Sequence, residues 1–408
     1  MSPRRAVITG LGVVAPTGIG VTGHWEATLA GECRISPVRD FDASALPVRL
    51  AGQVDGFEPA EFVENRLAVQ TDRWTWLALA ATQLGFVDAA LDPAKEDPFQ
   101  LSVVTASASG GNAFGQREIQ ALWQEGPRQV SAYQSIGWFY AASSGQISIR
   151  HKLKGACGVL VADAAGAVEA LASARRQIGR GLAAVVTGGT EAPLSPYALA
   201  CQTSQGTLSG ETDPARAYRP FAGDATGHVP GEGGAILVVE ELAHARRRGA
   251  PQVYAEVAGT ASTHDAFHVT DAAPDHTQLA RAIRLALERA GAGPGDIGAV
   301  FADGAGVPAL DRLEAAALRE VFGARGVPVA VPKTMTGRLC SGGAALDLAW
   351  AAQALSTGII PPSVNLAGRD DLDLVTGPRE APGLTAALVV ARGAGGFNSA
   401  AVLRRFDA

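Results

Sequence analysis

The sequence has few cysteines, few lysines and no long apolar run. Its cysteines lack the spacing of a disulfide framework or a metal site, which predicts reduced thiols in a cytoplasmic protein; they are Cys33, Cys157, Cys201 and Cys340. No apolar run reaches the roughly 18 to 20 residues that a membrane-spanning helix needs. Only four of the 34 basic residues are lysine, and the formal net charge of −6 argues against a nucleic-acid partner.

The composition indicates a large buried core. Apolar residues make up 47% of the 408 residues and charged residues 18%, which excludes a disordered chain. The 49 glycines predict many places where backbone segments approach each other closely. A chain of this length forms one large body or two fused halves.

Apolar strands alternate with amphipathic helices twice along the chain, which predicts an α/β fold with helices on both faces of each sheet. The basic run at 246–248, followed by Gly-Ala-Pro, resembles a boundary between halves. We therefore expect an N-terminal half at 1–248 and a C-terminal half at 249–408. The halves share this rhythm but show no clear sequence repeat.

The segment 154–178 has the pattern of a sharp strand-to-helix turn. A short apolar strand at 158–162 precedes Asp163, which stands where a helix N-cap residue belongs. Such a turn places a side chain at the helix N-terminus, where the helix dipole stabilises a thiolate or an oxyanion. Here the turn contains Ala164, Ala165 and Gly166, none of which can act as a nucleophile.

The segment Gly10-Leu-Gly-Val-Val-Ala15 formally matches the dinucleotide-binding pattern, but the required helix does not follow. A tight turn from strand to loop is the alternative that we favour. We expect no cofactor and no metal site.

Taken together, four segments resemble the β-ketoacyl synthase family nearly from end to end. They are VITGLGVVAPTG at the N-terminus, RPFAGDATGHVPGEGGAILVVEE in the middle, VPKTMTG at 331–337 and GGFNSA at 395–400. The resemblance implies a thiolase-like fold, in which two similar halves carry mixed sheets sandwiched between helices.

Active members of this family use one cysteine and two histidines to join acyl units. Position by position, the resemblance maps the cysteine to Ala164, the first histidine to Asp303 and the second to Arg338, while the family lysine is retained as Lys333. It implies that no catalytic residue remains. Both catalytic histidines converge in active relatives, so we suggest that Asp303 and Arg338 form a salt bridge.

A chain that keeps the scaffold without the catalytic residues resembles one branch of the family, the chain-length factor or ketosynthase β subunit of bacterial type II aromatic polyketide synthases. The branch implies a heterodimer with an active ketosynthase α subunit and contact with an acyl carrier protein that carries the malonyl group or polyketide chain. It implies neither a nucleic-acid nor a membrane partner. The resemblance further implies that the chain is a subunit of an acyltransferase complex for antibiotic biosynthesis and is not catalytic itself.

The resemblance also implies that residues after the strand at 101–106 line the tunnel in which the poly-β-keto chain grows. The matching positions are Asn112, Phe114, Gly115 and Ile119, with Tyr197 and Ala198 as further candidates. Asn112 and Gly115 are small where larger aromatic groups can sit, so we expect more tunnel volume and a nona- or decaketide or longer chain.

Two alternatives stay open. One is an independent condensing enzyme or acyltransferase that uses Cys340 or Ser341 as its nucleophile. The other is a homodimer that binds acyl chains without any role in a synthase.

Overall fold

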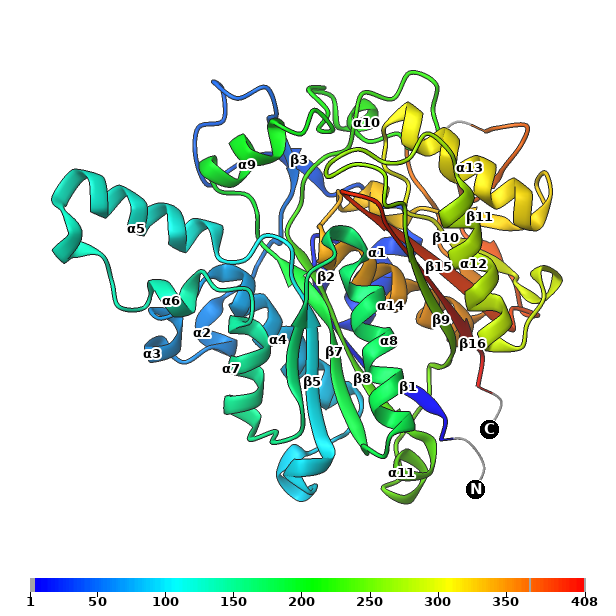
Figure 1. Cartoon of the computed structure of the whole chain (residues 1–408), viewed down its shortest axis with the longest axis horizontal. Coiled ribbons are helices and arrows are strands. Elements are labelled where there is room, and N and C mark those ends of the chain that lie inside the picture. The colour runs from blue at the N-terminus through cyan, green and yellow to red at the C-terminus, as the bar shows by residue number, and fades with distance from the viewer. Residues whose placement is uncertain (1–3, 367, 407–408) are drawn as a thin grey trace.

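The computed structural model describes residues 4–366 and 368–406, and it shows five alternating layers of helices and strands (Figure 1). Its strands are β1 Ala6–Ala15, β2 Gly18–Ile19, β3 Ile35–Pro37, β4 Leu50–Gly52, β5 Leu101–Ala106, β6 Cys157–Leu160, β7 Ala184–Glu191, β8 Gly233–Glu241, β9 Ala255–His264, β10 Ala299–Phe301, β11 Pro328–Ala330, β12 Ile359–Ile360, β13 Asp373–Leu374, β14 Arg379–Glu380, β15 Ala386–Gly393 and β16 Phe397–Arg404.

The α-helices are α1 Val21–Leu29, α2 Pro59–Phe62, α3 Asn65–Ala68, α4 Arg73–Asp88, α5 Asn112–Glu125, α6 Gln134–Gly137, α7 Ala142–His151, α8 Gly166–Gly179, α9 Pro196–Thr203, α10 Pro214–Ala217, α11 Leu242–Arg247, α12 Thr277–Ala290, α13 Pro308–Phe322 and α14 Ser341–Thr357. Short 3₁₀ turns include η4 Asp163–Ala165 and η6 Pro332–Met335.

The two parts of the chain build the same strand arrangement. The N-terminal strands run β1-β8-β7-β5-β6 and the C-terminal strands run β9-β16-β15-β10-β11-β13. In each set the first two neighbouring pairs are antiparallel and the next two are parallel. The sets meet where Val7 and Ile8 of β1 pair with β9. The predicted thiolase-like architecture is therefore confirmed.

Three hydrophobic clusters fill the spaces between layers. The central cluster holds α8 and α14 between the two sets of strands. Helices α4 and α7 cover the outer face of the N-terminal strands, and α12 and α13 cover the C-terminal ones. The all-round burial of α14, whose residues Ser341 to Leu355 are all buried, follows from this middle position.

The glycine-rich N-terminal segment is a strand, so the predicted tight turn is wrong. Strand β1 continues through Gly10 and Gly12 to Ala15. A Cβ on Gly12 would lie 1.7 Å from the carbonyl oxygen of Ala81, and one on Gly10 would lie 2.4 Å from that of Gly85. These two glycines let helix α4 pack directly on β1, which explains their spacing without a cofactor.

The interval expected to separate the halves, at 248/249, lies between α11 and β9. Strands β1 and β9 pair, so the two halves share one hydrogen-bonded strand order. The division of the chain into two halves at this position stays a prediction.

Candidate functional site

The predicted strand-to-helix turn is present, but Asp163 does not cap the helix. Its backbone has a positive φ of 47°, a conformation that costs energy for a residue other than glycine. Its carboxylate accepts a hydrogen bond at 2.9 Å from the backbone N–H of Ala394, in the turn between β15 and β16. Its carbonyl accepts from the hydroxyl of Ser341 at 2.9 Å. Ala164 follows, 5% exposed.

The loop that contains Asp303 is held by two buried carboxylates of helix α13. Glu314 accepts from the N–H groups of Asp303, at 2.7 Å, and Gly304, at 2.9 Å. Asp311, one turn earlier, accepts from Gly306 N–H at 3.1 Å. Burial raises the pKa of Glu314 to about 7 and that of Asp311 to about 6. The loop at 303–306 is therefore held in place by two carboxylates spaced three residues apart on one face of α13.

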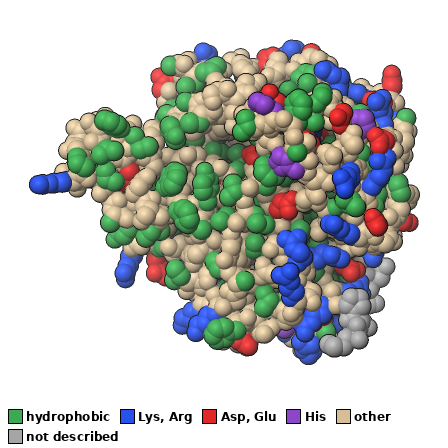
Figure 2. Space-filling model, in the orientation of Figure 1, with side chains coloured by type: hydrophobic (Ala, Val, Ile, Leu, Met, Phe, Trp, Pro, Cys, Tyr) green, Lys and Arg blue, Asp and Glu red, His purple; other side chains and the backbone are tan. Residues whose placement is uncertain are grey.

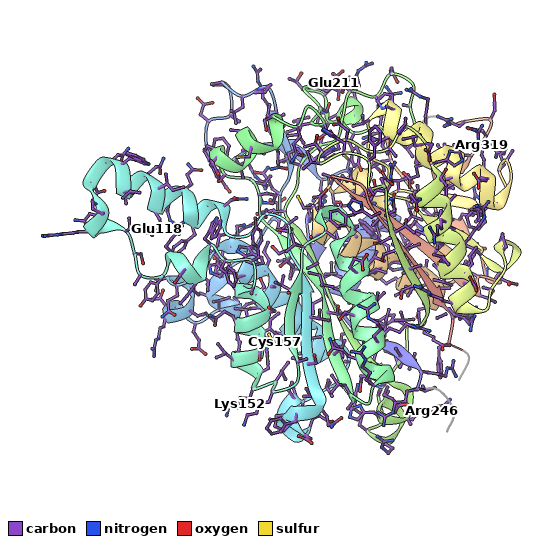
Figure 3. The ribbon with its side chains drawn as sticks, in the orientation of Figure 1. Glu118, Lys152, Cys157, Glu211, Arg246 and Arg319 are labelled. Carbon is purple, nitrogen blue, oxygen red and sulfur yellow. The ribbon has the colours of Figure 1, made fainter. Side chains whose placement is uncertain are left out.

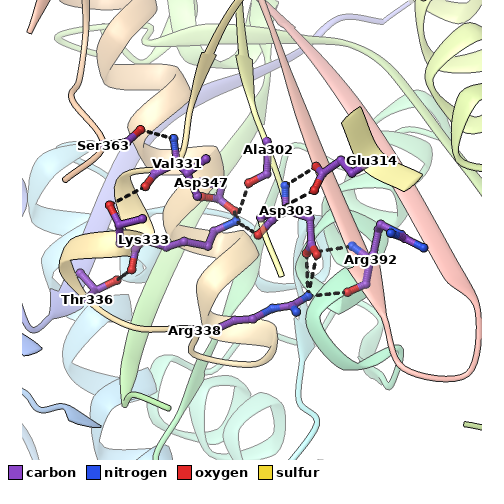
Figure 4. Close-up of polar contacts among 12 residues, drawn as sticks. Ala302, Asp303, Glu314, Val331, Lys333, Thr336, Arg338, Asp347, Ser363 and Arg392 are labelled. Atoms are coloured by element: carbon purple, nitrogen blue, oxygen red, sulfur yellow. Dashed lines mark hydrogen bonds and ion pairs between the residues drawn. The ribbon is translucent and has the colours of Figure 1, made fainter. Parts of the chain in front are cut away.

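Arg338 and Asp303 form the suggested salt bridge. The Nη2 atom of Arg338 lies 2.7 Å from Oδ1 of Asp303 and 2.8 Å from Oδ2 (Figure 4). The same nitrogen donates to the carbonyl of Arg392 at 2.9 Å, and the Arg392 N–H donates to Asp303 at 3.1 Å. Both side chains are largely buried, so the pair is shielded from water.

Lys333 faces inward beside this pair. Its ammonium lies 2.6 Å from Asp347 of helix α14 and donates to the carbonyls of Ala302, at 2.7 Å, and Asp303, at 3.1 Å (Figure 4). Its three donors are therefore committed to the loop and the central helix.

The three positions mapped to catalytic residues converge on one turn. Residues 392–394 contact Asp163 next to Ala164, and they contact Asp303 and Arg338 directly. Every charged group of this pocket is thus bound to another part of the protein. The arrangement holds these loops together. His228 is buried beside the pair, its Nδ1 has no hydrogen-bond partner within residues 4–366 and 368–406, and burial lowers its pKa to about 3. Among the described residues no cluster of histidine, cysteine, aspartate and glutamate has the geometry of a metal site.

Cys340 and Ser341, the two candidates for an alternative nucleophile, both lie near the turn at Asp163. Burial raises the pKa of the Cys340 thiol well above its usual range, and the carboxylates of Asp163 and Glu191 raise it further. Burial likewise raises the pKa of Glu191 to about 7. Ser341 already donates its hydroxyl to the backbone of Asp163. Cys157, at the start of β6, is exposed.

The predicted tunnel residues lie on two neighbouring helices. Asn112, Phe114, Gly115 and Ile119 are on α5, while Tyr197 and Ala198 begin α9. The helices are joined by Gln116, whose side-chain oxygen accepts from the Tyr197 N–H at 2.9 Å. Phe114 and Ala198 are buried, whereas Ile119 and Tyr197 are exposed. That these residues line a tunnel stays a prediction.

The volume expected at Gly115 is already occupied. A Cβ on Gly115 would lie 2.9 Å from Cδ1 of Trp138, so the indole ring fills the space that the missing side chain leaves. The expectation of open volume at this position is therefore wrong. From the sequence, Trp138 is consistent with an interface or cavity wall, but its contact with Gly115 is not apparent because the two residues lie 23 positions apart.

Helix α5 forms an arm that projects from the body, and Glu118 lies on it (Figures 1 and 3). Large apolar side chains are exposed along the arm and the surface beside it; they are Ile119, Leu122, Trp123, Tyr133, Trp138, Phe139, Ile149, Val161 and Tyr197. Figure 2 shows hydrophobic side chains gathered over the left and centre of this face. In the described part of the chain β6 pairs only with β5, so one of its edges is open. This face has the character of a protein contact surface.

No helix within the described ranges is both long and apolar enough to cross a membrane.

Comparisons with known proteins agree over the whole chain. Residues 4–245 match the Beta-ketoacyl synthase, N-terminal domain, and residues 254–367 match the Beta-ketoacyl synthase, C-terminal domain. The chain is 51% identical to the tetracenomycin polyketide synthase ketoacyl synthase beta subunit of Streptomyces glaucescens, over 99% of each chain. It is 49% identical to the actinorhodin polyketide putative beta-ketoacyl synthase 2 of Streptomyces coelicolor, over 98% of each.

Solved structures extend this likeness to three dimensions. The ishigamide ketosynthase/chain length factor superposes with a TM-score of 0.92 at 27% identity, covering 100% of each chain. A type II PKS acyl-carrier protein in complex with its ketosynthase bound to the hexaketide, AntDE:AntF, gives a TM-score of 0.89 at 27% identity, covering 99% of this chain and 100% of that one.

Proposed function

The chain belongs to the beta-ketoacyl synthase family, and from that membership we propose that it is the ketosynthase β subunit of a type II polyketide synthase. In this role it pairs with an active ketosynthase α subunit and sets the length of the poly-β-keto chain. The growing chain arrives on an acyl carrier protein. The complex transfers acyl groups, and this subunit contributes shape and contacts to it, without chemistry of its own.

The absence of catalysis in this subunit is supported chiefly by the pair of Asp303 and Arg338. A condensing site needs groups that stabilise a developing oxyanion. Asp303 instead brings a negative charge, and Arg338 neutralises it at 2.7 Å. The Ala394 N–H beside the turn is taken by the Asp163 carboxylate at 2.9 Å. Ala164 itself has no group that can carry an acyl chain.

The exposed apolar face supports the pairing. It combines the open edge of β6 with the arm α5, whose Trp123 is 82% exposed. An apolar surface of this extent on a chain with a net charge of −6 is best explained by burial against a partner subunit. We propose that the ketosynthase α subunit covers this face and that a tunnel beside α5 and α9 is completed there.

The alternative functions have weaker support. An independent condensing enzyme needs a reactive thiol or hydroxyl, but the pKa of Cys340 is raised and the Ser341 hydroxyl is engaged. An acyl-binding homodimer is compatible with the apolar face but not favoured by any further feature. We also propose a cytoplasmic location, since all four cysteines are free, as expected in a reducing compartment.

A subunit exchange tests the function. The chain is co-expressed with its ketosynthase α subunit and an acyl carrier protein, and product length is measured by mass spectrometry. It is then replaced by a β subunit from a synthase with a different product length. We expect the two subunits to co-purify and product length to follow the β subunit. A product length that follows the α subunit, or an acyl thioester on this chain alone, would contradict the proposal.

A further inference from the structure

Two glycines and two aromatic rings pack against each other between helix α5 and the C-terminal end of helix α6. The ring of Phe114 lies over Gly137, where an added Cβ would come within 2.8 Å of ring carbons. One residue further along each segment, the ring of Trp138 lies against Gly115, where an added Cβ would come within 2.9 Å of the ring carbon Cδ1. The contact is reciprocal: the aromatic ring of each segment packs against the glycine of the other.

The backbone on both sides fixes this contact. The Gly111 N–H donates to the Trp138 carbonyl at 3.2 Å, and a Cβ on Gly111 would lie 1.9 Å from the carbonyl oxygen of Gly137. Asp72, which also caps helix α4, accepts from the Phe114 N–H at 2.6 Å. The first turn of α5 therefore cannot move away from Trp138 without breaking contacts with α4.

Trp138 covers the middle of the α5 face that carries the predicted tunnel residues. Asn112, Gly115 and Ile119 are spaced at i, i+3 and i+7, so they share one face of α5. The Trp138 ring lies on that face at its central position, is 43% exposed and stands 6.0 Å from the Tyr140 ring. Any chain that runs along this face meets the indole before it meets the helix backbone.

We propose that Trp138, seated on Gly115, is a side chain that limits the length of the polyketide. This inference rests on the proposed function, and it names the side chain through which the subunit limits chain length. Residues in a close-packed wall exclude chain atoms by their volume, and an indole is larger than a two-carbon ketide unit. Gly115 acts as a positioning residue, because the absence of a Cβ leaves room for the ring against α5.

The test changes the volume on this face in both directions. Trp138→Ala in the reconstituted complex is expected to shift the main product to a chain longer by at least one ketide unit. In that background Gly115→Phe is expected to refill the space and to shift the product back toward the original length. Phe99→Ala is the matched control, because Phe99 is 62% exposed and lies outside this contact.

The outcomes separate this inference from the proposed function. If Trp138→Ala co-purifies with the α subunit and gives the original length, the role of Trp138 is refuted while the subunit exchange stands. If Trp138→Ala does not pair, Trp138→Leu, which keeps an apolar filler, is measured in the same way, and an unchanged length in that complex refutes it. If subunit exchange leaves product length unchanged, the proposed function itself fails.

Discussion

Arg338 reaches both carboxylate oxygens of Asp303 with a single nitrogen, at 2.7 and 2.8 Å, in the interior of the protein. The resemblance places these side chains where active relatives hold two histidines. Under that correspondence, a fixed pair of opposite charges stands where active relatives have two residues that can exchange protons. Such a pair gives a pocket shape without reactivity, because arginine does not release its proton at neutral pH.

Removing one partner of this pair is expected to destabilise the protein strongly. In Arg338→Met the Asp303 carboxylate is left buried without its counter-charge, which costs about 3–5 kcal/mol of unfolding free energy. Asp303→Asn in the same background removes the charge and is expected to recover most of that loss. Urea denaturation of the two single variants and the double variant measures the coupling. Additive losses would show that the pair does not act as a unit.

Restoring the missing cysteine is not expected to restore acylation. In Ala164→Cys the thiol is buried, since Ala164 is a buried position, and burial disfavours a thiolate. Intact-mass measurement after incubation with acyl carrier protein thioesters is expected to show no adduct. Asp163→Gly is the informative second change, because glycine accepts the φ of 47° and frees the Ala394 N–H. Rapid acylation of the single variant would contradict this account.

The native thiols are expected to differ in reactivity. Cys340 has a raised pKa and is expected to react with iodoacetamide at least about ten-fold more slowly than the exposed Cys33, Cys157 and Cys201. Peptide mass spectrometry over time compares all four within one sample. If Cys340 were the fastest to react, the alternative of an unusual nucleophile would regain support.

Gly12 is expected to tolerate no side chain. A Cβ there would lie 1.7 Å from the carbonyl of Ala81, so Gly12→Ala forces β1 and α4 apart and costs about 1–3 kcal/mol or more. Gly23→Ala is the matched control, since no heavy atom lies within 4 Å of its added Cβ. Thermal unfolding of both variants decides, and equal melting temperatures would refute the packing role.

A buried histidine makes stability depend on pH. Burial lowers the pKa of His24 to about 3, and the ring stacks on Trp350 at 5.3 Å. Below pH 6.5 the unfolded chain binds a proton that the folded protein does not, so stability falls on acidification. This single group contributes a loss of about 2 kcal/mol between pH 7.5 and pH 5.

The contribution of His24 is isolated by comparison with His24→Gln, because the buried Glu191 and Glu314 act in the opposite direction over part of this range. The unfolding free energy of wild type minus that of the variant is expected to fall by about 2 kcal/mol from pH 7.5 to pH 5. Parallel curves would contradict the assignment.

Local pattern was sufficient for most elements and for the fold class. Strand β5 has the predicted bounds, and helix α12 ends at Ala290, directly before Gly291 in a left-handed conformation. The motifs at 331–337 and 395–400 indicated the family. They also pointed to Ala164, Asp303 and Arg338 as one altered site.

The sequence by itself determined which residue types stand at the mapped positions, because a residue type at a motif position is visible without coordinates. Only the tertiary structure decided how those side chains are held. The bond from Asp163 to Ala394 joins residues 231 positions apart, and the Trp138 ring fills a space that Gly115 alone suggested was open. Neither contact leaves a periodic signal, since both depend on how separate segments pack and not on the pattern within either one.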